Sequence, residues 1–273
     1  MKKRILLLML ALVLCGAAAV ALSRAGKQPQ RAPESPKNTA AVRVVRWNYQ
    51  LTGEFKHDAG AYTQGLFFYD SKLYESAGQY GESSLRIVEL ETGKVLKRKN
   101  FDRKYFLEGA CVLDGLLYVL TWKENVCFVC DPATLEQKAL LRYRGEGWGL
   151  TTDGKSLIMS DGTDVIRFRD PKTFAVEREI SVRYNGQPLA WLNELEYFGG
   201  HIWANVYGLE ILVCIDPESG NVVEDIDCRG ILPANLKKPA TDVFNGIAFN
   251  PSDGNLYVTG KYWPKLFRIR KTK

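Results

Sequence analysis

The feature that most constrains this chain is an internal repeat. Five segments of the 273-residue sequence look alike: each begins with a short apolar strand, turns through Asp, Gly or Ser, and continues into a second strand with alternating apolar residues. A period of about 40 to 50 residues is typical of propellers and other arrays. The five segments are GLFFYDSKLYES from Gly65, EGACVLDGLLYVLTW from Glu108, GWGLTTDGKSLIMSDG from Gly147, NELEYFGGHIWANVYG from Asn193 and NGIAFNPSDGNLYVTGKYWP from Asn245.

A third and a fourth strand follow in most repeats. They are joined by turns whose Asp, Pro and Gly residues stabilise them locally, at residues 91–93, 131–134, 170–173 and 216–220. Apolar residues recur mostly at period two, which favours strands over long amphipathic helices. Four strands per repeat make one blade. The sequence therefore predicts an all-β fold, a five-bladed β-propeller with blades of four antiparallel strands.

The last repeat lacks a strand, because the chain ends soon after a third strand at residues 266–270. The alternating run VRVVRWNY at residues 42–49 is predicted to supply the fourth strand. This N-terminal strand would close the ring and remove the open sheet edges that invite aggregation. The longer segment 230–243 is expected to be either a helical turn or a loop.

The N-terminus has the layout of a secretory signal. Basic residues 2–4 precede an apolar stretch at residues 5–14, and small residues follow at 16–19. Residues 1–22 are therefore predicted to be a signal peptide or a membrane anchor. We expect the protein to be exported, either periplasmic or secreted, with a membrane tether as the alternative.

Processing of this segment has more than one reading. Cleavage after Ala19 or Ala21 fits the small-residue preference, whereas Cys15 offers a site for lipidation. Residues 23–40 are rich in Lys, Pro, Ser and Ala, which predicts a flexible linker. The propeller domain is predicted at residues 41–273.

Charge and cysteine content narrow the function further. The net charge of +6 comes largely from the N-terminal segment, so the folded part carries no basic stripe and no nucleic-acid partner is expected. A closed ring predicts a monomer.

Six cysteines leave five once a signal is removed, and an odd count argues against complete pairing. The spacing of Cys127 and Cys130 is that of a redox or metal pair, but both lie in one predicted strand and point to opposite faces, which favours buried structural thiols.

Blade inner ends converge on a central channel, so polar residues repeated at blade starts face one another there. Such residues are candidates for a functional site. At blade starts they are Gln64, Glu108, Trp148, Asn193, Glu194, Glu196 and Asn245, and on or after second strands they are Trp122, Asn205, Tyr207 and Lys261.

Seven motifs in these regions carry a resemblance. They are YTQGL at Tyr62, FLEGA at Phe106, GWGLTTDG at Gly147, LNELEY at Leu192, ANVYG at Ala204, NGIAF at Asn245 and TGKYWP at Thr259. In content and order they resemble the signatures of the plant and bacterial glutaminyl-peptide cyclotransferases, also called glutamine cyclotransferases, over most of the folded region.

The resemblance implies a metal-independent enzyme on a five-bladed propeller, with no cofactor. Its partners would be peptides or proteins with an N-terminal glutamine, which it would convert to pyroglutamate with release of ammonia. Only His57 and His201 are available as imidazole ligands, and no zinc-site spacing is present in the sequence.

Such a reaction needs one group that takes a proton from the α-amine and returns one to the leaving nitrogen. By its place in the family's F-x-E-G pattern, Glu108 is the catalytic candidate. The neighbouring Phe106 and Leu107 would desolvate its carboxylate and raise its pKa. The alternative reading is a Glu that caps a turn at the blade mouth.

The resemblance also implies a substrate-binding set. Indole, amide and ammonium groups from it would stabilise the developing oxyanion, and aromatic rings would form an apolar wall. The set consists of Tyr62, Gln64, Phe106, Trp122, Trp148, Asn193, Tyr207 and Lys261. Tyr62, Leu107, Ala110 and Tyr207 depart from the usual family residues, which leaves rate and substrate preference open. Core packing is the alternative for the tryptophans.

Two other functions stay open at this point. A propeller can serve as a non-catalytic binding scaffold, because one fold hosts many functions. A metal-dependent lactonase-like hydrolase would instead need carboxylates and amides that converge on an ion, and Glu108, Asn193 and Asn245 are its candidate ligands.

Overall fold

The structure is a computed structural model that describes residues 43–273. The predicted signal peptide or anchor at 1–22 and the predicted linker at 23–40 lie outside these residues. In the described part of the chain, no helix is long and apolar enough to cross a membrane.

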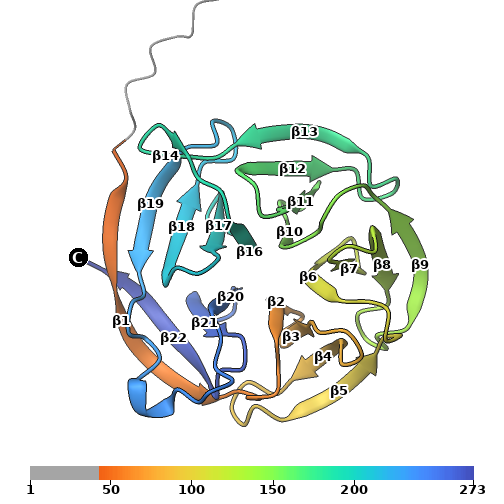
Figure 1. Cartoon of the computed structure of the whole chain (residues 1–273), viewed down its shortest axis with the longest axis horizontal. Coiled ribbons are helices and arrows are strands. Elements are labelled where there is room, and N and C mark those ends of the chain that lie inside the picture. Colours follow the sequence, from red (N-terminus) through yellow and green to blue (C-terminus); the bar gives the residue numbers. More distant parts are fainter. Residues whose placement is uncertain (1–42) are drawn as a thin grey trace, which may run out of the picture. The chain divides into compact units, whose positions relative to one another are not determined.

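Five four-stranded antiparallel units stand around a common axis, as Figure 1 shows, and confirm the predicted five-bladed β-propeller. Blade 1 contains β2 (Thr63–Tyr69), β3 (Lys72–Ala77), β4 (Ser84–Val88) and β5 (Val95–Asn100). Blade 2 contains β6 (Leu107–Leu113), β7 (Leu116–Thr121), β8 (Val126–Cys130) and β9 (Gln137–Arg142). Blade 3 contains β10 (Leu150–Thr152), β11 (Leu157–Met159), β12 (Val165–Arg169) and β13 (Val176–Ser181).

The remaining strands form blades 4 and 5. Blade 4 contains β16 (Leu192–Phe198), β17 (His201–Val206), β18 (Ile211–Ile215) and β19 (Val222–Asp227). Blade 5 contains β20 (Phe244–Asn250), β21 (Asn255–Gly260), β22 (Lys265–Thr272) and the N-terminal strand β1 (Val45–Lys56).

The outer hairpins are set by a repeated Asp turn. In blade 2, Asp131 Oδ1 accepts the backbone N–H groups of Ala133 and Thr134, at 3.0 and 2.9 Å. Asp170 and Asp216 accept the N–H groups two and three residues ahead in the same way. Because these bonds are local, the sequence by itself is enough to place the turns.

Strand β1 closes the ring, but its bounds differ from the prediction. It runs from Val45 to Lys56 rather than over residues 42–49. Residues 48–56 pair antiparallel with β22, and residues 45–47 pair parallel with β19. One strand therefore fastens blade 4 to blade 5. The sequence pattern missed its second half because a register irregularity between Leu51 and Gly53 interrupts the alternation.

The hydrophobic core lies between the blades rather than in one mass. Five clusters of buried side chains each join two adjacent blades, and the cluster between blades 1 and 2 is typical, with Phe67 and Leu85 packed against Leu117 and Val119. Each blade is therefore stable only against its neighbours. Burial of this apolar surface contributes roughly 25 cal/mol per Å².

The five cysteines that the structure describes are free and buried, which confirms the interpretation of Cys127 and Cys130 as buried thiols. Cys127 packs between blades 2 and 3, whereas Cys130 packs between blades 1 and 2. Burial raises the pKa of the Cys130 thiol to about 11. Both side chains are thus part of the apolar core on opposite faces of β8.

Two connections carry short elements. The segment at 230–243, left open by the sequence, contains a single 3₁₀ turn at Ala234–Leu236. The connection between blades 3 and 4 contains a small hairpin that the sequence did not predict, formed by β14 (Arg183–Tyr184) and β15 (Gln187–Pro188). This second connection leads directly into β16.

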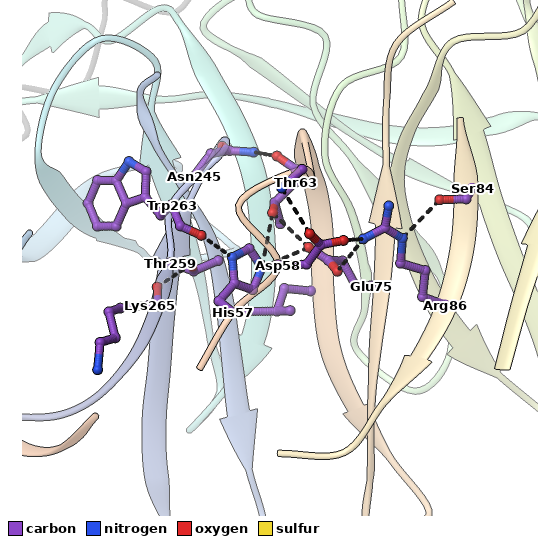
Figure 2. Close-up of polar contacts among 12 residues, drawn as sticks. His57, Asp58, Thr63, Glu75, Ser84, Arg86, Asn245, Thr259, Trp263 and Lys265 are labelled. Atoms are coloured by element: carbon purple, nitrogen blue, oxygen red, sulfur yellow. Dashed lines mark hydrogen bonds and ion pairs between the residues drawn. The ribbon is translucent and has the colours of Figure 1, made fainter. Parts of the chain in front are cut away.

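A buried polar network lies at the seam where β1 passes into blade 1 (Figure 2). His57 Nδ1 lies 2.6 Å from the carbonyl oxygen of Trp263, and His57 Nε2 lies 2.9 Å from Glu75 Oε1. Glu75 Oε1 also accepts a hydrogen bond from Thr63 Oγ1, at 2.7 Å. Arg86 Nη1 lies 3.6 Å from Glu75 Oε2 and donates to Asp58 Oδ2 at 2.8 Å. Side chains from β1's end, β2, β3 and β4 are thus tied together.

The network holds opposite charges. A carbonyl oxygen only accepts hydrogen bonds, so Nδ1 of His57 carries a proton. The ionised Glu75 accepts a hydrogen bond from a second N–H of the ring, at Nε2. Burial by itself lowers the pKa of His57, but Glu75 and the Trp263 carbonyl raise it on balance. Burial likewise raises the pKa of Glu75, but His57 and Arg86 lower it on balance. The pair is therefore an imidazolium and a carboxylate.

Replacement of His57 by Gln is expected to destabilise the fold by about 3 kcal/mol, because it leaves a buried carboxylate with one partner fewer. Because the folded pKa of His57 is raised, its contribution is complete below its unfolded pKa and is lost as pH rises through the folded value. The free energies of unfolding of the wild-type protein and of His57→Gln, measured by denaturant titration across pH, should therefore converge at high pH. His201→Gln on blade 4 is the matched control, and an equal loss in both variants would contradict the prediction.

Candidate active site

The inner strands of the blades stand around the axis (Figure 1). In β2, β6, β16 and β20 the pairing register shifts near the start of the strand, as it does in a β-bulge. A bulge re-aims a side chain out of the normal alternation. The residues at these four irregularities are Gln64, Glu108 with Gly109, Asn193 with Glu194, and Asn245 with Gly246.

Glycine lets the inner strands approach one another closely. A Cβ on Gly109 would lie 2.3 Å from the backbone nitrogen of Leu150, and a Cβ on Gly149 would lie 2.0 Å from the carbonyl oxygen of Asn193. Any side chain at either position would push neighbouring blades apart. Glycine therefore follows the pocket residues Glu108 and Trp148 for a packing reason.

A pocket of about 310 Å³ opens at this end of the axis. It brings together the predicted catalytic residue and all eight predicted substrate-binding residues, which come from all five blades. Within residues 43–273, Trp191 is the one further residue that lines it. The complete lining is Tyr62, Gln64, Phe106, Glu108, Trp122, Trp148, Trp191, Asn193, Tyr207 and Lys261.

Glu108 lies at the base of the pocket and is only 4% exposed. Gln64 Nε2 donates a hydrogen bond to Glu108 Oε1 at 3.0 Å, and Asn245 Nδ2 in turn lies 3.4 Å from Gln64 Oε1. Burial raises the pKa of Glu108 well above its ordinary value, and the charges of Glu146 and Glu124 raise it further, whereas Lys261 opposes the shift. The carboxyl group is thus held in one orientation and readily takes up a proton.

Lys261 is the cation of the pocket base and is 2% exposed. Its Nζ lies 4.5 Å from the ring centroid of Tyr62 and 5.2 Å from that of Tyr207, so two aromatic faces stabilise the ammonium group. Burial lowers the pKa of Lys261 to about 8, although Glu108 and Asp242 counteract the effect. At mildly alkaline pH the ammonium and the neutral amine forms of Lys261 are therefore both populated.

Trp122 and Trp148 are held by a carboxylate that the sequence did not single out. Their indole N–H groups both donate to Glu146 Oε2, at 2.7 and 3.0 Å. Lys123 Nζ lies 3.6 Å from the other oxygen of Glu146 and 3.7 Å from the centroid of the Trp122 ring. Both indole donors are already in use. The expected role of these indoles toward an oxyanion stays a prediction, and the other expected donors are Gln64, Asn193 and Lys261.

Asn193 offers an acceptor. The side chain is 2% exposed, and its Oδ1 has no hydrogen-bond partner within residues 43–273. A buried amide oxygen without a partner is costly, so a bound N–H group would be favourable here.

Other axial candidates serve the scaffold. The Glu194 carboxylate reaches across the axis and accepts the backbone N–H groups of Leu66, at 3.2 Å, and Ile247, at 2.7 Å. Glu196 accepts the N–H of Phe249 at 2.9 Å, and Asn205 accepts that of Gly246 at 2.9 Å. These side chains fasten strands of different blades to one another and do not line the pocket.

The candidate ligands of a metal-dependent hydrolase supply one carboxylate, Glu108, and two amides, Asn193 and Asn245. Among residues 43–273, no group of three or more His, Cys, Asp or Glu side chains is placed to hold a metal ion.

Sequence reasoning missed Trp191 and Glu146. Trp191 precedes β16 with a positive φ of +67°, a conformation that costs a bulky residue about 1 to 3 kcal/mol. No local pattern marks such a position. Glu146 stands two residues before Trp148, between two glycines, and this placement in the GEGWGL motif was the only available signal.

Comparisons with known proteins agree with this geometry. A family model described as glutamine cyclotransferase matches residues 18–271. The chain belongs to the glutamine cyclotransferase family. It is 40% identical over 227 residues to glutaminyl-peptide cyclotransferase from Arabidopsis thaliana, which covers 81% of this chain and 70% of that protein. The crystal structure of Myxococcus xanthus glutaminyl cyclase superposes with a TM-score of 0.79 and 34% identity, over 84% of this chain and 98% of that one.

In this member of the glutamine cyclotransferase family, Glu146→Gln removes a negative charge near Glu108 and keeps one oxygen acceptor for the indoles. The pKa of Glu108 is then expected to fall, since Glu146 raises it, and the acid limb of kcat/KM should move to lower pH by roughly 0.5 to 1 unit. Steady-state rates measured across pH report this shift. The exposed Glu136→Gln is the control, and an unmoved acid limb in Glu146→Gln would refute the electrostatic role.

Proposed function

We propose that this chain is a glutaminyl-peptide cyclotransferase that converts the N-terminal glutamine of peptides and proteins to pyroglutamate. The observation that carries the proposal is one buried carboxylate, Glu108, at the base of an aromatic-walled pocket in a chain of this family. The relative from Arabidopsis thaliana bears the name of this activity.

The reaction is an intramolecular acyl transfer. The α-amine nitrogen forms a bond to the side-chain carbonyl carbon, the bond from that carbon to the amide nitrogen breaks, and ammonia leaves. One proton leaves the amine and one reaches the departing nitrogen, so a single group can carry it between them.

Glu108 is the proposed carrier of this proton. An N-terminal amine has a pKa of about 7.7 to 8.0. Burial raises the pKa of Glu108, which makes its carboxylate a stronger base toward that amine. Glu108 would act first as general base toward the amine and then as general acid toward the leaving group, while Gln64 keeps it oriented.

Lys261 and Asn193 are proposed to bind the side-chain carboxamide of the substrate glutamine. The Lys261 ammonium would stabilise negative charge as it develops on the carbonyl oxygen. The unpartnered Oδ1 of Asn193 would accept an N–H of the substrate. Tyr62, Phe106 and Trp122 would contact the methylene groups of glutamine and exclude water, which favours ring closure over hydrolysis.

Glu108→Gln is expected to lower kcat by about 10²- to 10⁴-fold, the usual contribution of a general acid–base group. Pyroglutamate and ammonia formed from a glutaminyl dipeptide measure the effect, and circular dichroism checks the fold. Glu91→Gln, in an exposed turn of blade 1, is the control. Full activity in Glu108→Gln would overturn the assignment.

Metal independence is a separate prediction with its own test. Wild-type turnover should persist in the presence of a chelator, and metal analysis should find no stoichiometric ion. Loss of activity on chelation would favour the metal-dependent alternative.

The pH profile of the reaction tests the role of Lys261. Its alkaline limb is expected near pH 8, because burial lowers the pKa of Lys261 to about 8.

We also propose export, on the strength of the basic, apolar and small-residue segments within residues 1–22. Fractionation of the producing cells and sequencing of the mature N-terminus test this proposal. A product that begins after Ala19 or Ala21 outside the cytoplasm is expected. An intact N-terminus in the cytoplasmic fraction would contradict it.

A further inference from the structure

The pocket residues differ in exposure between its base and its mouth. Glu108 and Lys261 at the base are buried, whereas Tyr207 is 37% exposed and Trp191 is 58% exposed at the mouth. Both reacting groups of the substrate belong to its first residue and must reach Glu108. The rest of a bound peptide therefore leaves the pocket past the exposed rings.

Three rings form one aromatic cluster at this mouth. The centroid of Trp191 lies 6.2 Å from that of Trp148 and 6.3 Å from that of Tyr207, and Trp148 lies 5.9 Å from Tyr207. Glu146 holds the indole of Trp148 from behind. Trp148 is thus held in place, and the exposed ring of Trp191 lies beside it.

The backbone keeps Trp191 in place against its own preference. Its φ of +67° suits glycine or asparagine, yet the chain has its largest side chain there. The Trp191 N–H donates to the Gly162 carbonyl at 2.7 Å, and the Trp191 carbonyl accepts the N–H of Tyr207 at 2.8 Å. An exposed bulky ring on strained backbone at a pocket mouth points to a contact made outside the protein.

We propose that Trp191 and Tyr207 form a subsite for the side chain of the residue that follows the N-terminal glutamine, and that this subsite prefers an aromatic side chain. Aromatic rings pair favourably with other rings in stacked or edge-to-face geometry. The proposal rests on the cyclotransferase function and extends it to the second substrate residue. Tyr80 also contacts the pocket ring Phe106, at 5.4 Å between centroids, but it does not line the pocket, and its hydroxyl donates to Glu124.

The experiment compares three substrates: glutamine amide, Gln-Ala amide and Gln-Phe amide. For wild-type protein, kcat/KM for Gln-Phe amide should exceed that for Gln-Ala amide by about 3- to 10-fold, the gain expected from one aromatic pair. Trp191→Gly should bring this ratio close to 1 through KM, while glutamine amide changes less than about twofold. Trp191→Phe should retain most of the preference.

The variants are chosen so that the fold survives. Glycine adopts a positive φ at no steric cost, so Trp191→Gly should melt no lower than wild type, and Trp191→Asn serves as a second variant with the same tolerance. Asn185→Gly is the matched control, because it relaxes another positive φ, of +50°, in the same connection without contact with the pocket. It should leave every ratio unchanged.

Two results would overturn the subsite. If the ratio of kcat/KM for Gln-Phe amide to that for Gln-Ala amide is unchanged in Trp191→Gly and Trp191→Asn, the Trp191 ring does not contact the second substrate residue. Equal losses on glutamine amide and Gln-Phe amide show that the ring only completes the pocket wall. If wild-type protein turns over none of the three substrates, the proposed function fails, and the subsite fails with it.

Discussion

The close approach of the inner strands is the constraint on which the rest of the structure depends. At Gly109 and Gly149 one blade touches the backbone of the next, with no room for a Cβ. This contact brings side chains from five different blades within one pocket of about 310 Å³. It persists only because β1 closes the ring, pairing with β22 along most of its length and with β19 at its start.

The close packing also sets the electrostatics of the pocket. Glu108 and Lys261 are removed from water together, and burial disfavours the charged form of each. Each counteracts the shift of the other. In the proposed reaction Glu108 would carry the proton, and the Lys261 ammonium would stabilise the developing oxyanion. The same burial disfavours ionisation of the core cysteines, such as Cys130, which lowers their reactivity.

Much of the fold and most of the pocket could be predicted from the sequence. The repeated strand pairs, the Asp turns at Asp131 and its counterparts, and the blade-start residues such as Gln64 all follow local rules. The motif resemblance then selected pocket residues that the structure brings together. The reach of β1 to Lys56 was missed, because a register irregularity near Gly53 breaks the pattern that periodicity detects.

The sequence by itself thus determined the number of blades and the turns, because period-two alternation and turn hydrogen bonds act over a few residues, and its motifs pointed to most of the pocket residues. Only the tertiary structure decided that Glu146 joins two indoles, that Trp191 stands exposed at the mouth, and that burial brings the pKa of Lys261 to about 8. These properties depend on contacts between blades. Their distances and solvent exposure are fixed by how five sheets pack around one axis, and no local pattern records that packing.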